Sequence, residues 1–134
     1  MPQSLAQVLV HIVFSTKNRK RFLSDADLRA RLYAYMAVVL RDDVDSPAVI
    51  INGTDDHVHV LVSLSRKFAI MDVVKVMKTE TTKWLKKEGV RDFAWQSGYG
   101  VFSVSQSMRD AVVDYICNQE ERHKRTTFQE EFRE

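Results

Sequence analysis

Two histidines spaced to share one ligand lie near the middle of the chain. His57 and His59 alternate with Val58, Val60 and Val62 in the segment HVHVLVSL, and this period of two predicts a strand over residues 57–64. Both imidazoles then lie on one face of the strand, opposite the valines. The pair can hold a metal ion, although two half-exposed strand histidines would show the same spacing. A His-x-His pair also occurs in zinc enzymes, so it does not identify the metal.

Two carboxylates directly precede the histidine pair. Asp55 and Asp56 lie just upstream of the predicted strand. A carboxylate that accepts the second ring N–H of a metal-bound histidine fixes the orientation of that ring. We therefore expect Asp56 to orient one of the imidazoles without binding the metal itself.

A tyrosine and a glutamine stand one helical turn apart near the end of the chain. In SMRDAVVDYICNQEERHK an apolar stripe runs to Tyr115 and Ile116, and its next position is Gln119. Periodicity alone favours a core tyrosine, and a glutamine at the stripe's edge can bond to backbone. Alternatively, the helix packs on the sheet face that carries His57 and His59, where a metal ion would satisfy the amide carbonyl.

Together these four side chains have the chemistry of a phosphodiester site. Three neutral ligands leave a metal ion its full charge, and the ion can stabilise the charge that builds up when phosphorus is attacked. A tyrosine hydroxyl is a nucleophile that gives a covalent intermediate, and the phosphotyrosine link conserves the energy needed to rejoin a strand. The usual pKa of a phenol is about 10, so its proton must be removed, and the sequence does not identify the base.

The composition fits one soluble domain over residues 1–134. Apolar residues make up 45% and charged residues 28% of the chain. No apolar run is long enough to span a membrane, and no basic residue precedes the first apolar stretch as in a signal peptide. The single cysteine, Cys117, excludes an internal disulfide and is typical of a reducing cytoplasm. We therefore expect a cytoplasmic protein.

Basic side chains gather at two places, although the formal net charge is only +2. Such patches suggest a polyanionic partner, but a solvated surface gives the same pattern. The first cluster is Lys17, Arg19, Lys20 and Arg21, and the second is Lys75, Lys78, Lys83, Lys86 and Lys87.

The order of the predicted elements indicates how these residues are brought together. Alternation predicts strands near 5–15, twice within 47–64, and near 99–105. Helical spacing predicts helices from an N-cap at Ser24 to about Arg41, from about 70 to 88, and from an N-cap at Ser107 to about Lys124. The β-α-β-β-α-β order predicts an α+β, ferredoxin-like antiparallel sheet with two helices on one face. The additional C-terminal helix, which carries Tyr115, is then left for the other face.

Four collinear segments resemble one family over nearly the whole chain. HIVFSTKNRKR, GTDDHVHVLVSL, FAWQSGYGVFSVS and DYICNQEERHKRTTFQEEF are similar to the single-tyrosine transposases of small bacterial insertion sequences. These enzymes belong to the HUH class, which is named for two histidines around a hydrophobic residue, here His57-Val58-His59.

The resemblance implies metal-dependent cleavage and rejoining of single-stranded DNA at the ends of the element, with recognition of a hairpin. Tyr115 would become linked to a 5′ phosphate and free a 3′ hydroxyl, while Mg²⁺ or Mn²⁺ is held by His57, His59 and Gln119. Two imidazoles make manganese at least as suitable as magnesium. The family works as a homodimer whose sheets join edge to edge, and the tyrosine helix can serve the partner's histidines. Relatives often carry a second histidine next to the position of His123, which this chain lacks.

The resemblance suggests that the basic clusters bind DNA, because phosphates of a DNA hairpin bind lysine and arginine. Trp95 or Phe102 can stack on an unpaired base, although each also fits a core. The residues expected to bind DNA are Lys17, Arg19, Lys20, Arg21, Lys75, Lys78 and Lys83.

Two other functions fit parts of the pattern. The same sheet order occurs in RNA-recognition domains, so a non-catalytic module that binds single-stranded nucleic acid is one alternative; however, the sequence has no RNP-like motif. A metal-dependent hydrolase that activates water is the other, and it would form no covalent intermediate.

Overall fold

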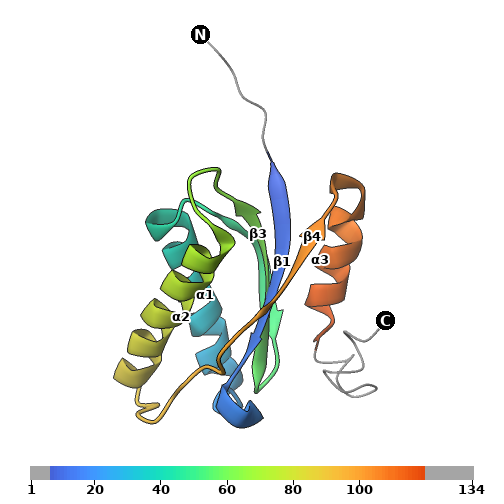
Figure 1. The fold of residues 1–134 in the computed structure, drawn as a ribbon. Helices are drawn as coiled ribbons and strands as arrows, with labels where there is room; N and C mark the ends of the chain where they lie inside the picture. The colour runs from blue at the N-terminus through green and yellow to red at the C-terminus, as the bar shows by residue number, and fades with distance from the viewer. Residues whose placement is uncertain (1–6, 120–134) are drawn as a thin grey trace.

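Within the described part of the computed structural model, residues 7–119, four antiparallel strands form one sheet in the order β2-β3-β1-β4 (Figure 1). The two central strands, β1 and β3, are fully paired with each other from Val8↔Leu64 to Ser15↔His57. The strands are β1 (Val8–Ser15), β2 (Ala48–Gly53), β3 (His57–Leu64) and β4 (Gly100–Val104).

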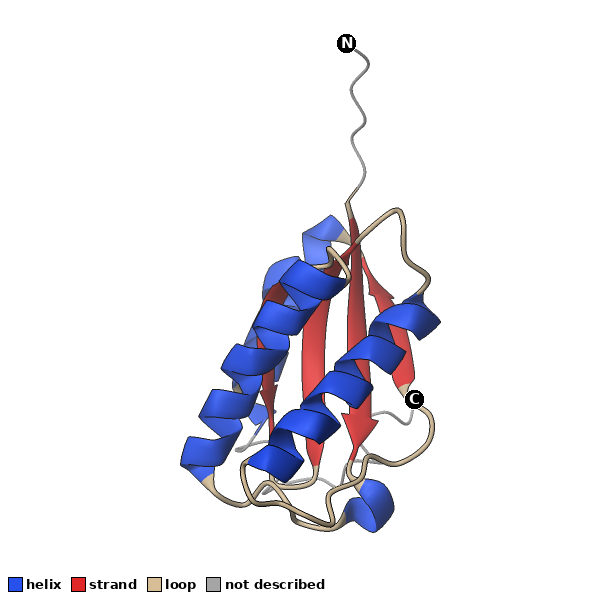
Figure 2. Cartoon of the chain, turned by 90° about the vertical axis from the view of Figure 1, so that its left-hand side faces the viewer, coloured by secondary structure: helices blue, strands red, loops and turns tan. Residues whose placement is uncertain are grey.

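Helices cover both faces of this sheet (Figures 1 and 2). The long helices α1 (Ala26–Asp43) and α2 (Ile70–Lys87) pack side by side on one face. The shorter α3 (Arg109–Cys117) lies on the opposite face, where it contacts β2 and β3. The short 3-10 turns η1 (Lys17–Arg19) and η2 (Gln106–Met108) follow β1 and β4.

The alternation of β1 and β3 sorts their apolar side chains into two cores. Val10 and Phe14 belong to the large core beneath α1 and α2. On the other face Leu9, Leu61 and Ile116 form a smaller core with the inner side of α3. Burial of apolar surface stabilises by roughly 25 cal/mol per Å², so this second core holds α3 on the sheet.

The predicted ferredoxin-like α+β fold is confirmed. The elements follow the predicted β-α-β-β-α-β order, the third helix lies on the face that the other two leave uncovered, and Tyr115 lies within it. None of the helices between residues 7 and 119 is both long and apolar enough to cross a lipid bilayer.

Two predicted helix caps are wrong. The N-cap of α1 is Asp25 instead of Ser24, and its carboxylate accepts a hydrogen bond from the backbone N–H of Asp27 at 2.9 Å. A carboxylate is favoured there because it also interacts with the positive end of the helix dipole. Ser107 lies inside η2, which turns the chain back over the sheet, and α3 begins at Arg109 without a side-chain cap bond.

The third helix is also shorter than predicted. α3 ends at Cys117, and Asn118 takes the C-cap position. The predicted extension from residue 120 to Lys124 and the start of the first strand at residues 5–6 lie outside the described residues, as does His123.

Candidate metal and tyrosine site

The two histidines of β3 lie on the sheet face that α3 covers. His57 and His59 are both fully buried, and their ring centroids are 5.0 Å apart. Val58 and Val60, which alternate with them, are buried in the large core on the other face. The shared orientation expected from the period of two is therefore present in the structure.

A carboxylate and a hydroxyl support His57 through its Nδ1 atom. Nδ1 lies 2.8 Å from Oδ1 of Asp56 and 2.9 Å from the hydroxyl of Thr54. Asp56 also pairs with the Nε atom of Arg19 at 3.2 Å. Burial raises the pKa of Asp56, but the hydrogen bonds from His57 and Arg19 outweigh it and hold that pKa well below its usual range. Asp56 is thus an anion whose contacts leave Nε2 of His57 as the nitrogen suited to a metal ion.

A glycine allows this end of β3 to approach β2. A Cβ atom at Gly53 would lie 2.2 Å from the backbone carbonyl oxygen of His57, a distance that no side chain tolerates. Gly53 also follows Asn52, the partner of His59 in the β2–β3 ladder. The tight Gly53 contact therefore helps to set the backbone position from which His57 projects.

A third histidine, which the sequence analysis did not select, supports His59. Nε2 of His11 on β1 lies 2.9 Å from Nδ1 of His59, and the two rings are stacked with centroids 5.1 Å apart. Burial lowers the pKa of His11 to about 4, which keeps this ring neutral at neutral pH. The only sequence signal was that His11 falls on the mixed face of its strand, opposite Val10, Ile12 and Phe14.

Tyr115 of α3 faces these rings. Its ring centroid lies 5.8 Å from that of His59 and 6.1 Å from that of His11, with edge-on geometry in both cases. The side chain is half-buried at the edge of the small core, and its hydroxyl oxygen is buried. The structure thus brings Tyr115 together with the histidine pair within one chain.

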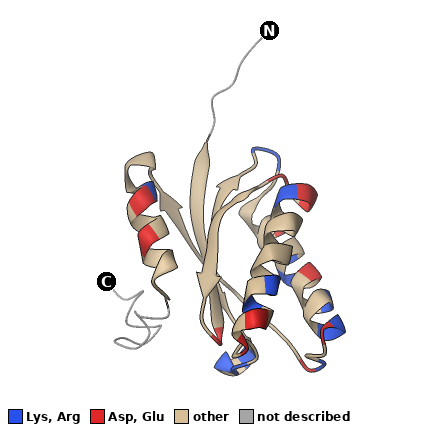
Figure 3. Ribbon diagram, turned by 180° about the vertical axis from the view of Figure 1, so that it is seen from behind, with Lys and Arg blue, Asp and Glu red and all other residues tan. Residues whose placement is uncertain are grey.

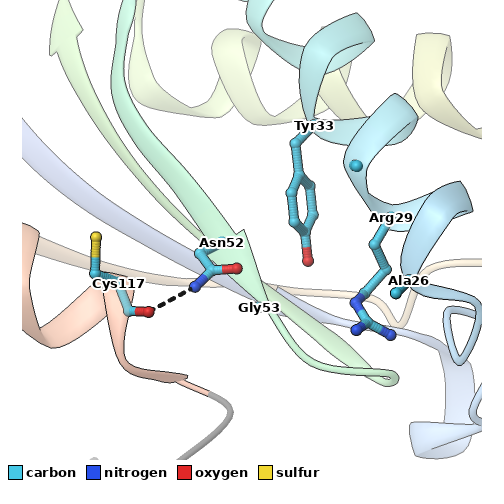
Figure 4. Close-up of a pocket in the computed structure, with 7 residues that line it drawn as sticks. Ala26, Arg29, Tyr33, Asn52, Gly53 and Cys117 are labelled. Atoms are coloured by element: carbon cyan, nitrogen blue, oxygen red, sulfur yellow. Dashed lines mark hydrogen bonds between the residues drawn. The ribbon is translucent and has the colours of Figure 1, made fainter.

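A cross-element hydrogen bond fixes the end of the helix that carries Tyr115. The Nδ2 atom of Asn52 on β2 donates to the backbone carbonyls of Ile116 at 2.9 Å and Cys117 at 3.1 Å. Figure 4 shows the bond to Cys117. These carbonyls belong to the last turn of α3, where side chains commonly supply donors that the helix itself lacks. Next to this contact, Asn52 and Cys117 line a pocket of about 310 Å³ that is closed on its other side by α1.

Gln119 is buried one turn after Tyr115. Its Nε2 atom donates to the backbone carbonyl of Tyr115 at 3.0 Å. Its Oε1 atom is buried and accepts no hydrogen bond from the residues the structure describes. A buried acceptor without a donor costs roughly 1–3 kcal/mol.

A metal ion fits this donor set. Among the described residues no three side chains of the types His, Cys, Asp and Glu are grouped as metal ligands, so a site would need the amide oxygen. The carbonyl of Gln119 with the Nε2 atoms of His57 and His59 would hold the ion, and the ion would satisfy the buried Oε1.

The basic residues predicted to bind DNA differ in whether they already form ion pairs within the protein. Lys17 and Lys75 are exposed, whereas Lys20, Arg21 and Lys83 make surface ion pairs with Asp92, Asp55 and Glu80 at 3.4–3.5 Å. Such pairs contribute little, so phosphates can compete for these side chains. Figure 3 shows basic residues on α1 and α2, in loops at both ends of the sheet and on α3, while the strands carry none.

Two of the seven basic side chains have structural contacts of their own. Arg19 pairs with Asp56, and the ammonium of Lys78 donates to the backbone carbonyls of Gln96 at 2.8 Å and Gly98 at 2.7 Å. Lys78 thereby ties α2 to the loop that leads into β4. Their roles in DNA binding stay predictions.

The two aromatic residues considered for base stacking have different environments. Trp95 packs edge-on against Phe14 and Phe93, and its indole N–H donates to the hydroxyl of Thr81 at 3.0 Å. It is therefore a core side chain. Phe102 on the edge strand β4 is 44% exposed, with its ring centroid 5.9 Å from that of His11. Phe102 is thus an exposed aromatic ring beside His11.

The model of one protein family, described as IS200-like transposase, matches residues 4–119. The chain belongs to the IS200-like transposase family. The match includes all four side chains of the candidate site and covers all of the described residues.

Two solved structures share the fold of this IS200-like transposase. A candidate transposase from Deinococcus radiodurans is 21% identical with a TM-score of 0.70, and the match covers 89% of this chain and 95% of that one. A REP-associated tyrosine transposase bound to a REP hairpin is 13% identical with a TM-score of 0.68, and the match covers 92% and 73%. No curated protein matches the sequence.

Membership of the IS200-like transposase family favours a DNA-processing enzyme over a module that only binds nucleic acid. The sheet face also differs from that of an RNA-recognition domain. It carries three buried histidines beneath α3, where an RNA-recognition domain stacks bases on aromatic side chains.

Proposed function

We propose that this transposase cleaves and rejoins single-stranded DNA through a covalent link between Tyr115 and a 5′ phosphate. One observation carries the proposal: the ring of Tyr115 lies 5.8 Å from that of His59, and a buried amide oxygen without a donor among the described residues follows one turn later at Gln119. A nucleophile and candidate ligands for a metal therefore occupy one small region.

In the proposed reaction the phenol of Tyr115 gives up its proton and its oxygen attacks the scissile phosphorus. A Tyr–O–P bond forms, the bond from phosphorus to the 3′ oxygen breaks, and that oxygen leaves as a 3′ hydroxyl after it takes up a proton. Attack of a 3′ hydroxyl on the phosphotyrosine ester reverses these steps and regenerates the phenol. Because the ester conserves the bond energy, rejoining needs no nucleotide cofactor.

The proposed cofactor is Mg²⁺ or Mn²⁺ held by His57, His59 and Gln119. When bound, the ion would act as a Lewis acid that stabilises negative charge on the phosphate oxygens. The contribution of the protein is to orient the ligands: Asp56 and Thr54 hold Nδ1 of His57, and the backbone contact of Gln119 aligns its amide.

The proposed substrate is single-stranded DNA that carries a hairpin. Support comes from the REP-associated transposase, which was solved with a REP hairpin and shares the fold. The basic residues predicted from the sequence would contact its phosphates, and Phe102 is exposed next to the site. We further propose a homodimer joined edge to edge, for which β2 and β4 are the outer strands of the sheet.

The experiment uses labelled single-stranded oligonucleotides that cover the DNA flanking the gene, incubated with the protein and Mn²⁺. Denaturing electrophoresis should reveal a labelled band that migrates with the protein. Tyr115→Phe should abolish this band and leave hairpin binding unchanged, because only the nucleophilic oxygen is lost. The control Tyr99→Phe alters an exposed tyrosine and should leave the band intact.

Three results would reject the proposal. An adduct formed by Tyr115→Phe would exclude Tyr115 as the nucleophile. Cleavage by the wild type without any adduct would identify a hydrolase that uses water. Hairpin binding without cleavage under any divalent metal would identify a binding module.

A further inference from the structure

His11 contacts Nδ1 of His59, and the position of the shared proton decides whether Nε2 of His59 can bind a metal ion. The N–H···N bond between the two rings holds one proton, so either His59 donates from Nδ1 or His11 donates from Nε2. If His11 donates, the proton of a neutral His59 resides on Nε2 and blocks that atom. If His59 donates, its Nε2 carries a lone pair.

Nδ1 of His57 also makes a hydrogen-bond contact, but its partner is Asp56. In both histidines the contact made by Nδ1 comes from a neighbouring element or turn, so the two Nε2 atoms are the ones suited to a common ligand. The partner of His57 is the carboxylate of Asp56, whereas the partner of His59 is an imidazole ring on β1. The β1–β3 register, which pairs Val13 with His59 and His11 with Leu61, brings that ring within reach.

We propose that His11 is a positioning residue that accepts the Nδ1 proton of His59 and thereby fixes His59 as an Nε2 metal ligand. This inference rests on the metal site of the proposed function. An imidazole acceptor orients the ring without adding a negative charge, so more of the ion's charge is left for the phosphate.

Two substitutions test the hydrogen-bond acceptor and the aromatic ring of His11 separately. His11→Phe keeps an aromatic ring between His59, Phe102 and Tyr115 but has no acceptor. His11→Gln loses the ring but carries an amide oxygen that reaches about as far as Nε2. Mn²⁺ affinity is measured from the electron paramagnetic resonance signal of the free ion, with thermal unfolding recorded for each variant.

We expect His11→Phe to weaken Mn²⁺ binding by roughly 10- to 100-fold, as found when outer partners of metal ligands are lost, and His11→Gln to restore most of it. A purely structural role for the ring predicts the opposite order. Wild-type affinity in His11→Phe would overturn the inference and leave the metal site intact. Absence of Mn²⁺ binding by the wild type would overturn both.

Direct observation of the proton needs no variant. In Mg²⁺-loaded, ¹⁵N-labelled wild-type protein, scalar coupling across the N–H···N bond correlates His59 Nδ1 with His11 Nε2. A proton covalently attached to His59 Nδ1 supports the assignment, and a proton attached to His11 Nε2 overturns it.

Discussion

At the residue scale, Asp56 contacts both a candidate metal ligand and the basic loop. It accepts from Nδ1 of His57 at 2.8 Å and pairs with Arg19 of the basic loop at 3.2 Å. The loop expected to contact DNA phosphates is therefore linked through one carboxylate to a candidate metal ligand. Loss of this carboxylate should affect the metal more than the fold.

Asp56→Ala tests this link. We expect Mn²⁺ affinity and the rate of adduct formation to fall by roughly 10- to 100-fold, because the ring of His57 loses its charged acceptor. Asp55→Ala is the matched control, since the Asp55 carboxylate makes a surface ion pair with exposed Arg21 at 3.5 Å and its backbone bond to Leu23 is kept, so this variant should behave as wild type. Equal losses in both variants would show that local charge alone matters.

Substitution of Gln119 should lower the metal affinity without a matching loss of stability. Gln119→Leu removes the buried Oε1 that accepts no hydrogen bond from the described residues, but it also removes the Nε2 bond to the Tyr115 carbonyl. These effects oppose each other, so the free energy of unfolding without metal should change by no more than about 1.5 kcal/mol. Mn²⁺ affinity, measured by titration, should fall by at least about the 10- to 100-fold seen for outer partners. A strongly destabilised variant that keeps wild-type Mn²⁺ affinity would contradict the ligand role.

The sequence indicated some of these residues and missed others for a physical reason. His57, His59 and Asp56 are close along the chain, so the alternation of one strand places them. Tyr115 and Gln119 are related by one helical turn. His11 lies 48 residues from its partner His59, and their contact depends on the β1–β3 register, which alternation within one strand does not specify.

At the element scale, Asn52 connects β2 to the end of α3. The helix has only nine residues, and its side-chain contacts with the sheet come mainly from Ile116 and its neighbours in the small core. Isolated helices of this length are unstable in water, so α3 depends on what it packs against. The Asn52 bonds to the carbonyls of Ile116 and Cys117 are therefore expected to matter for the position of Tyr115.

Asn52→Ala should loosen α3 without unfolding the sheet. The loss of such bonds costs roughly 0.5–1.5 kcal/mol each, so amide hydrogen exchange within α3 should speed up by about a factor of ten, with adduct formation reduced. In the control Asn118→Ala, the lost amide bond runs to Asp114 inside the same helix, and docking should persist. Uniformly faster exchange in β1 and β3 would instead indicate global destabilisation.

The order of elements followed from hydrophobic periodicity, but their ends did not. Asp25 replaces Ser24 as a cap because neighbouring residues with similar capping ability cannot be ranked by type alone. The η2 turn before α3 arises because the chain must cross from β4 to the opposite side of the small core within a few residues. Such a turn is a tertiary requirement with no periodic signature.

At the scale of the whole molecule, the sheet separates structural support from the candidate chemistry. The face beneath α1 and α2 contains the large apolar core, and the opposite face contains the histidines, Tyr115 and a much smaller core. The larger core supplies most of the apolar burial, which leaves the second face free to bury polar groups. In this arrangement α3 packs on the sheet of its own chain.

The packing of α3 predicts that each chain builds its own site. If Tyr115 acts with the histidines of the same chain, a mixture of His59→Ala and Tyr115→Phe should form no adduct, because neither chain holds both groups. The measurement is denaturing electrophoresis after subunit exchange, with the two variants given different molecular masses; wild type mixed with Tyr115→Phe checks that exchange does not inhibit. An adduct on the His59→Ala chain would mean that α3 reaches the histidines of a partner, and that the contacts of Asn52 with Ile116 and Cys117 must form between subunits or break during the reaction.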